Sequence, residues 1–137
     1  MGASKGRQYN YEAMFLSPPT AGPALEELLS HIKEILDKAG AEVIALRKWD
    51  ERRLAFEIKK NKRGLYLLAY FSCDPATVSE IERLSNLSEQ LLRVMVLRAD
   101  HLTMEEMQSA DAREELATEA ALRASEQHEE ETAEASA

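Results

Sequence analysis

Basic side chains concentrate between residues 47 and 63. This stretch holds eight Lys or Arg residues and three acids, a local net charge of +5. It contains the run Lys60-Asn61-Lys62-Arg63-Gly64, in which Asn and Gly tolerate positive φ and so predict a chain reversal. A cationic turn between two strands offers charge and hydrogen-bond donors to phosphate groups. Charge alone is equally compatible with a solvated strand face, so both interpretations stand at this point.

We predict that the cations around this turn contact RNA phosphates. Trp49 is a candidate contact to RNA or to a protein partner, although a strand Trp also packs against Lys and Arg stems. The predicted RNA contacts are Arg52, Arg53, Lys59, Lys60, Lys62 and Arg63, with Arg93 added from a neighbouring strand.

Catalytic and metal chemistry find little support in the sequence. The three histidines, His31, His101 and His128, are far apart, and the single Cys73 has no metal-ligand partner at a recognisable spacing. The loop Ser17-Pro-Pro-Thr-Ala-Gly-Pro23 carries neither the Lys of a P-loop nor the Arg used by small acyl-phosphate hydrolases of this topology. We therefore expect no enzyme activity, no cofactor, no metal and no small-molecule substrate.

Base stacking on the sheet is also disfavoured. RNA-recognition modules place aromatic residues on their third strand within a K/R-G-F/Y-G/A-F-V-x-F/Y motif. Arg63, Gly64 and Tyr70 agree with it, but Leu65 and Leu67 stand where aromatic rings would stack on bases. Stacking contributes roughly 1–3 kcal/mol per base. The pattern therefore favours recognition of RNA phosphates and RNA shape, with an apolar sheet free for a protein partner.

The elements that position these residues follow the order strand, helix, strand, strand, helix, strand. Residues 65–71 are apolar on both parities, and a buried helix is the alternative that their Tyr and Phe content disfavours. Gly40 is placed to cap the first helix, and Asp74 with Pro75 begins the second. The ranges are strands at 9–16, 41–59, 64–73 and 90–98, and helices at 23–39 and 74–86. Tyr11, Phe15 and Tyr66 are predicted to pack in the core or sheet.

This order predicts an α+β, ferredoxin-like βαββαβ fold, with a four-stranded antiparallel sheet and two helices on one face. The other face is left to solvent or partners. In the second strand, one parity contains Ile44, Leu46, Leu54, Phe56 and Ile58 and is predicted to be buried, whereas the opposite parity carries cations.

The acidity of the chain lies at its C-terminal end. Residues 99–137 hold 12 acids and 2 basic residues, whereas residues 1–98 have a net charge of +2. The predicted organisation is a flexible N-terminus at 1–8, an RNA-binding domain at 9–98 and an acidic, partly helical or disordered extension at 99–137. A capping box at Thr103 to Glu106 starts a helix without a wide apolar stripe, expected to be solvated and to fade into disorder from Glu129. Its role is either to solubilise the chain or to compete with RNA for the basic turn.

Length and cysteine content indicate one soluble domain. A core of about 100 residues folds without disulfides, and a single cysteine forms none within the chain. The N-terminus lacks the apolar run of a signal peptide, and no stretch approaches the length of a membrane span. The expected location is cytoplasmic, without membrane association.

The residues from Tyr11 to Arg98 resemble the family of bacterial small-subunit ribosomal protein six. The resemblance rests on Tyr11-Glu12, Gly40, Trp49, the run Arg52-Arg53-Leu54-Ala55-Phe56 with Ile58 and Lys60, Gly64 with Tyr66, and Leu92-Arg93. It implies a ferredoxin-like, non-enzymatic structural protein of the ribosome. The implied partners are the central domain of small-subunit ribosomal RNA and small-subunit ribosomal protein eighteen.

Two departures from the family pattern lie in the second strand. Asp50 replaces a usual Gly after Trp49, which removes a residue that eases a bulge, and Glu57 replaces a usual Pro before Ile58. Tyr9 stands where the family often has Arg. The alternative from another class is a ferredoxin-like regulatory domain that binds a small molecule as a homodimer, although the chain lacks a Gly-rich or acidic ligand loop.

Overall fold

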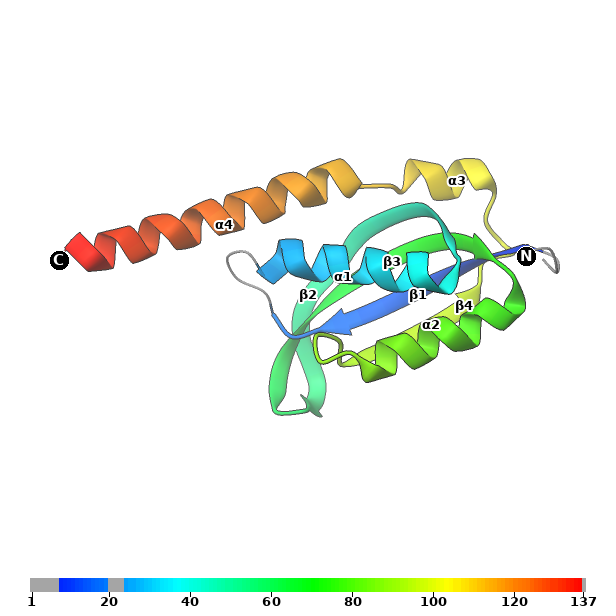
Figure 1. Cartoon of the computed structure of the whole chain (residues 1–137), viewed down its shortest axis with the longest axis horizontal. Helices are drawn as coiled ribbons and strands as arrows, with labels where there is room; N and C mark the ends of the chain where they lie inside the picture. The colour runs from blue at the N-terminus through cyan, green and yellow to red at the C-terminus, as the bar shows by residue number, and fades with distance from the viewer. Residues whose placement is uncertain (1–7, 20–23, 137) are drawn as a thin grey trace.

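The computed structural model describes residues 8–19 and 24–136, with side chains described through residue 126. Its four strands form one antiparallel sheet in the order β2-β3-β1-β4 (Figure 1). The ferredoxin-like βαββαβ fold predicted from the sequence is confirmed. The elements are β1 (Tyr9–Ser17), α1 (Ala24–Ala39), β2 (Glu42–Ile58), β3 (Asn61–Cys73), α2 (Pro75–Leu87), β4 (Arg93–Arg98), α3 (Met104–Ser109) and α4 (Arg113–Ser136).

The helix boundaries follow the capping signals of the sequence. Gly40 has φ of 88°, the left-handed conformation that ends a helix, and Ala41 N donates to Leu36 O. At α2 the Asp74 carboxylate accepts a hydrogen bond from Ala76 N at 2.8 Å, and Pro75 opens the first turn. Pro23 and the first seven residues lie outside the described residues, so the predicted flexible N-terminus at 1–8 stays a prediction.

The main core lies between the sheet and helices α1 and α2. The inward side chains of β1 and β3 meet the apolar faces of both helices there. Tyr11 and Phe15 are buried as predicted, whereas Tyr66 is only half-buried. The largest fully enclosed side chains of this core are Phe15, Phe71, Leu25, Leu28, Ile32, Leu36, Leu65, Leu67 and Ile81.

Strand β2 is irregular, which overturns the simple two-face alternation predicted for it. Its register against β3 shifts between Val43 and Ala45, between Lys48 and Asp50, and between Arg53 and Ile58. Each shift changes which parity faces the core. Leu46 therefore packs in the main core, whereas Leu54, of the same parity, is buried on the opposite face of the sheet, where Phe56 is 62% exposed.

The irregularity at Asp50 occurs without the glycine that the family pattern led us to expect. The Asp50 carboxylate accepts a hydrogen bond from Glu51 N at 2.8 Å, which satisfies a backbone donor beside the register shift. Asp50 has no positive φ. A side chain that bonds the neighbouring backbone thus accommodates the shift here.

The reversal between β2 and β3 lies at Lys59 and Lys60, before both Asn61 and Gly64, the residues that predicted it. Ile58 pairs with Asn61, and the two central lysines have φ of 47° and 68°. Two consecutive positive φ angles are typical of a type I′ turn. The Asn61 side-chain amide donates to the carbonyl oxygens of Ile58 and Lys59, which stabilises the turn from outside it.

Gly64 serves packing rather than the turn. A Cβ atom at this position would lie 2.5 Å from Leu16 Cδ1 and 3.1 Å from Leu54 Cδ2. Both distances are shorter than ordinary van der Waals contact. The glycine therefore leaves room for the Leu16 and Leu54 side chains to pack over β3 where the hairpin leaves the sheet.

Helix α3 covers part of the sheet face that the sequence analysis left to solvent or partners. Met107 is fully buried against Ala45, Leu68 and Tyr70 on that face. The capping box predicted at Thr103 and Glu106 is present, with both side-chain-to-backbone hydrogen bonds formed. Only the part of this sheet face that α3 leaves uncovered is therefore exposed to solvent or partners.

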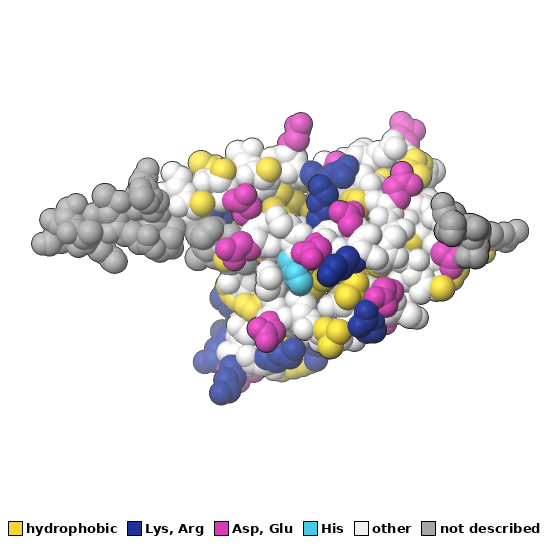
Figure 2. All heavy atoms as spheres, in the orientation of Figure 1, with side chains coloured by type: hydrophobic (Ala, Val, Ile, Leu, Met, Phe, Trp, Pro, Cys, Tyr) yellow, Lys and Arg dark blue, Asp and Glu magenta, His cyan; other side chains and the backbone are white. Residues whose placement is uncertain are grey.

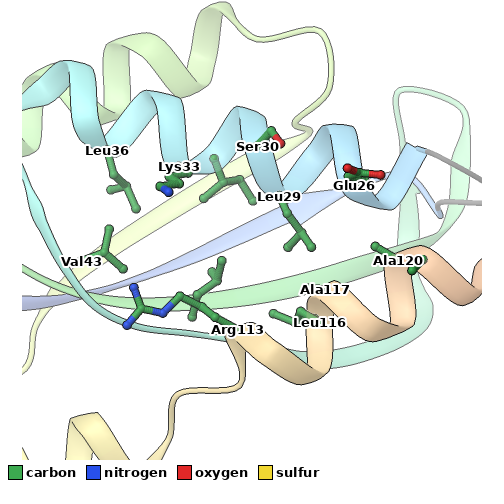
Figure 3. A pocket seen from close by; sticks show the side chains of 13 residues that line it. Glu26, Leu29, Ser30, Lys33, Leu36, Val43, Arg113, Leu116, Ala117 and Ala120 are labelled. Carbon is green, nitrogen blue, oxygen red and sulfur yellow. The ribbon is translucent and has the colours of Figure 1, made fainter.

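Helix α4 packs on the opposite side, beside α1 and β2. Leu116 and Ala120 are buried in the main core, which corrects the expectation of a fully solvated helix. The helix continues to Ser136, whereas the sequence indicated disorder from Glu129. A cavity of about 390 Å³ remains between α4 and α1, lined by Leu29, Leu36, Leu116 and small alanines (Figure 3).

Candidate nucleic-acid interface

The turn-proximal part of the β2–β3 hairpin, residues 52–63, projects from the sheet and carries the predicted cations; we call it the hairpin tip. Figure 1 shows it extending beyond the helices, and Figure 2 shows Lys and Arg side chains gathered there. Six of the seven predicted RNA contacts lie on it, and all six are exposed: Arg52, Arg53, Lys59, Lys60, Lys62 and Arg63.

Arg53 and Arg63 stand directly opposite each other in the antiparallel pair of β2 and β3. Like charges in this arrangement repel and destabilise a hairpin. Arg52, the next residue of the strand, points to the other face and lies opposite Gly64. The cations thus surround the tip rather than lining one face of it.

Trp49 lies in a second region, where the hairpin joins the sheet. Its ring contacts the Tyr66 ring edge-on, with centroids 5.4 Å apart, and remains 44% exposed. The Arg52 guanidinium lies 5.3 Å from the Trp49 ring centroid and pairs with Asp50 at 3.3 Å. This cation–π contact agrees with the packing alternative considered for Trp49, yet it leaves much of the ring accessible.

Arg93 joins this region from β4. Its guanidinium lies 5.6 Å from the ring centroid of Phe56. Phe56 belongs to β2, which forms the opposite edge of the sheet from β4. The structure therefore brings Arg93 together with Arg52, whereas Arg53 and the turn lysines lie farther out on the tip. The contact roles of these residues remain predictions.

An apolar groove runs along the exposed half of the open sheet face; we call it the sheet groove. It encloses about 430 Å³ and holds Glu12 as its one acidic lining residue. Phe56, Met95 and Leu97 are 62%, 61% and 52% exposed. Phe56 was predicted to be buried, and Met95 and Leu97 were not singled out from the sequence. The sequence signal for this groove is the run 94–97, whose residues are apolar on both parities. An outer strand with one buried face needs apolar residues on only one parity, so the second apolar parity indicates an exposed apolar surface.

Lys48, near the middle of β2, is paired with α4 instead of being free for RNA, and the acidic Glu51 of the same strand is paired with an arginine of α4. Lys48 Nζ lies 2.9 Å from Glu119 Oε1, and Arg123 Nη2 lies 2.9 Å from Glu51 Oε1 and 3.0 Å from Glu119 Oε2. Burial alone would lower the pKa of Arg123, but the hydrogen bonds and charges of Glu51 and Glu119 outweigh it and raise that pKa. The acidic helix thus engages the root of β2. Among the described side chains, none of its carboxylates pairs with the predicted tip cations.

His31 and Cys73 are in structural positions. His31 Nε2 lies 2.6 Å from Ser88 Oγ, a contact between α1 and the loop after α2. Burial, with a smaller effect of the Asp74 charge, raises the pKa of the Cys73 thiol to about 11 and so disfavours the reactive thiolate. Residues 8–19 and 24–126 contain no group of three or more potential metal ligands. No helix in the described part of the chain is long and apolar enough to cross a membrane.

Comparisons with known proteins agree with this architecture. The family model of ribosomal protein S6 matches residues 10–98. A small ribosomal subunit protein bS6 of Desulforamulus reducens is 37% identical over 90 residues, which cover 65% of this chain and 95% of that protein. The bS6 protein of Corynebacterium kroppenstedtii is 35% identical over 96 residues, covering 66% of this chain and 97% of the relative.

A solved structure extends the likeness to three dimensions. The crystal structure of 30S ribosomal protein S6 from Thermotoga maritima has a TM-score of 0.63 and 26% identity, covering 75% of this chain and 98% of that protein. The family match ends at Arg98, so α3 and α4 lie beyond it. On residues 10–98, the chain belongs to the ribosomal protein S6 family of the small ribosomal subunit.

Proposed function

We propose that this chain binds the central domain of small-subunit ribosomal RNA together with small-subunit ribosomal protein eighteen, as a structural and non-catalytic component of the ribosome. The observation that carries the RNA half of the proposal is the pair Arg53 and Arg63, opposed across the hairpin tip. Two like charges at this distance are unfavourable in the free protein. Phosphate groups bound between them would turn that repulsion into attraction.

The tip turn supports the same proposal. Lys59 and Lys60 both adopt positive φ, where an L-residue with a Cβ costs roughly 1–2 kcal/mol relative to glycine. Costly backbone conformations persist where they position functional side chains. Both charges are held at the outermost point of a projecting ribbon, where RNA phosphates are accessible.

The sheet groove is the proposed site for protein eighteen. It combines exposed apolar side chains with Arg52 and Arg93 at its rim. Contiguous apolar surface of this kind is typical of protein interfaces. Because α3 occupies the other half of the same sheet face, the partner contact is confined to the half that contains Trp49, Phe56 and Met95.

The RNA contact is tested by charge reversal at the tip. We expect the double variant Arg52→Glu/Arg53→Glu to bind a central-domain ribosomal RNA transcript at least about tenfold more weakly, with a salt dependence reduced by about two counterions. Affinity is measured by fluorescence anisotropy across a salt series, with and without protein eighteen. Unchanged affinity and salt slope would exclude the assignment.

The matched control is Lys38→Glu. Lys38 is an exposed cation at the end of α1 and lies 3.6 Å from Glu34. This substitution makes the net charge more negative at a site away from the hairpin. If the tip contacts RNA specifically, Lys38→Glu should weaken RNA affinity much less, per charge changed, than the substitutions at the tip.

The protein contact is tested separately with Met95→Glu/Leu97→Glu. Both side chains are more than half exposed, so the fold tolerates the change. We expect these variants to lose binding of protein eighteen, measured by calorimetry, while keeping the RNA salt slope of the unmodified chain. Retained binding of protein eighteen would place the partner elsewhere.

A further inference from the structure

Strand β2 is an outer strand of the sheet and spans 17 residues. Among the strands that the structure describes, none pairs with the outer side of β2. A long outer edge of this kind is a template for pairing with another chain, and monomeric proteins cover or interrupt it. The other outer strand, β4, has only 6 residues.

The connection between α3 and α4 occupies the outer edge of β2. Leu46 N donates to Asp111 Oδ1 at 3.0 Å, and Leu46 O accepts from Ala112 N at 2.9 Å. Arg113 Nη2 donates to Ile44 O at 3.4 Å. Both backbone groups of Leu46 and the carbonyl of Ile44 are therefore satisfied by the C-terminal segment instead of by a strand.

This connection is fixed in place on both sides. The Asp111 carboxylate also accepts from the Arg113 guanidinium, at 3.0 and 2.9 Å. Before it, Met107 of α3 is buried on one face of the sheet; after it, Leu116 of α4 is buried on the other. The chain thus crosses from one face of the sheet to the other around the edge of β2. Figure 1 shows the order of α3, the connection and α4.

Ion pairs continue the cover along the strand. Lys48 pairs with Glu119, and Glu51 pairs with Arg123 one turn farther along α4. Because Lys48 and Glu51 follow Leu46 in β2, the helix runs beside the strand beyond the hydrogen-bonded connection. A second strand approaching this edge would have to displace both.

We propose that residues 104–123 form a C-terminal clamp that closes the β2 edge against pairing with a second copy of this chain. Release of the clamp exposes the edge, and two such edges pair antiparallel about a two-fold axis. The second copy is the occupant because each chain presents the same edge, and an antiparallel pair of identical edges is self-complementary and closed. The clamp lies beyond the S6 family match, so this role belongs to the extension and not to residues 10–98.

The test uses the full chain with the double variant Asp111→Ala/Ala112→Pro. The first change removes the acceptor for Leu46 N, and the second removes the N–H that bonds Leu46 O. Hydrogen exchange by NMR reports on the Leu46 amide in dilute solution, and sedimentation velocity reports on oligomeric state up to NMR concentration. We expect Leu46 exchange to accelerate at least about tenfold and a dimer to form with rising concentration.

Dimer formation through β2 also predicts a change in the exchange of the Leu46 amide. The Leu46 amide must become protected again when the dimer is populated, because a partner strand now accepts its hydrogen. The control Asp100→Ala removes a carboxylate that bonds Arg98 and not β2, and it is expected to stay monomeric with slow Leu46 exchange. Unchanged Leu46 exchange, a variant that stays monomeric, or association without renewed protection of Leu46 would each overturn the proposal.

Discussion

The hairpin tip and the C-terminal clamp both act on strand β2, but they are built by opposite rules. At the tip, cations face cations, the lysines of the turn have positive φ, and the side chains are exposed. At the clamp, cations face carboxylates, backbone groups are hydrogen-bonded, and Met107 and Leu116 are buried. At one end of the strand exposed like charges lie close together, whereas at the other the charged and backbone groups are paired within the chain.

The difference separates binding from stability along a single element. Opposed cations such as Arg53 and Arg63 repel each other in the free protein, and an anionic ligand relieves that repulsion. Residues that complete the core gain nothing further from one. Substitutions at the clamp should therefore change the free energy of unfolding, and substitutions at the tip should change affinity for RNA.

The largest expected effect on stability is at Met107. This side chain is fully buried between α3 and the sheet, so Met107→Ala leaves a cavity and is expected to lower the free energy of unfolding by about 2–5 kcal/mol. Chemical denaturation followed by circular dichroism measures it. The hairpin counterpart Phe56→Ala, at a side chain that is 62% exposed, should change stability by less than about 0.5 kcal/mol.

An equal loss of unfolding free energy in Met107→Ala and Phe56→Ala would contradict the proposed difference between the clamp and the hairpin. A loss at Met107 below about 1 kcal/mol would mean that α3 detaches independently of the rest of the fold. The clamp would then be a separate local unit.

Cys73 provides a reporter that belongs to neither region, because it lies in the core at the end of β3. Burial raises the pKa of its thiol to about 11, whereas an unfolded chain has a cysteine pKa of about 8.5. As pH rises between these values, the unfolded chain releases a proton that the folded chain retains. The free energy of unfolding should therefore fall, by on the order of 3 kcal/mol.

Denaturation curves from pH 8 to pH 11 check this expectation. Cys73→Ala removes the thiol, so its stability should decline less over the same interval. Parallel curves for both proteins would show that the thiol is not held neutral by the fold. Thiol labelling of Cys73 then reports global opening, in contrast to Leu46 exchange at the clamp.

The elements of the fold were predictable because their signals are local. Gly40, Asp74 and Thr103 act within a few residues of their helix ends, and the apolar spacing of α1 reports its buried face directly. The capping box even identified the start of α3. The concentration of cations around one hairpin was equally visible, since it depends on neighbours in sequence.

What the sequence missed depends on contacts between distant residues. Leu116 and Ala120 form only a narrow apolar stripe, sufficient because the groove beside α1 and β2 accepts small side chains. Asp111 is an ordinary loop residue until its carboxylate meets Leu46 N, 65 positions away. The turn was misplaced because Asn61 supports it from its side-chain amide rather than by adopting positive φ itself.

The turn offers a smaller effect with opposite signs for stability and binding. Lys59→Asn/Lys60→Gly places residues suited to a type I′ turn at both positive-φ positions and should stabilise the fold by about 1 kcal/mol. The same variant removes two tip cations, so its affinity for central-domain RNA should fall and its salt slope should decrease. A variant that is more stable and binds equally well would show that these lysines do not contact RNA.

The smallest expected effect tests whether charge or packing holds the clamp. Glu119→Gln keeps the shape of the side chain but removes the charge that Lys48 and Arg123 share, and should cost about 0.5–1 kcal/mol at low salt. Glu115→Gln, at an exposed glutamate of the same helix, is the matched control. Because salt screens partly exposed ion pairs, the difference between the two variants should shrink as ionic strength rises, while the cost of Met107→Ala stays constant. If the loss of stability in Glu119→Gln persists at high salt, hydrogen-bond geometry and not charge stabilises the contact between the clamp and β2. The clamp and the tip would then differ in packing but not in the role of charge.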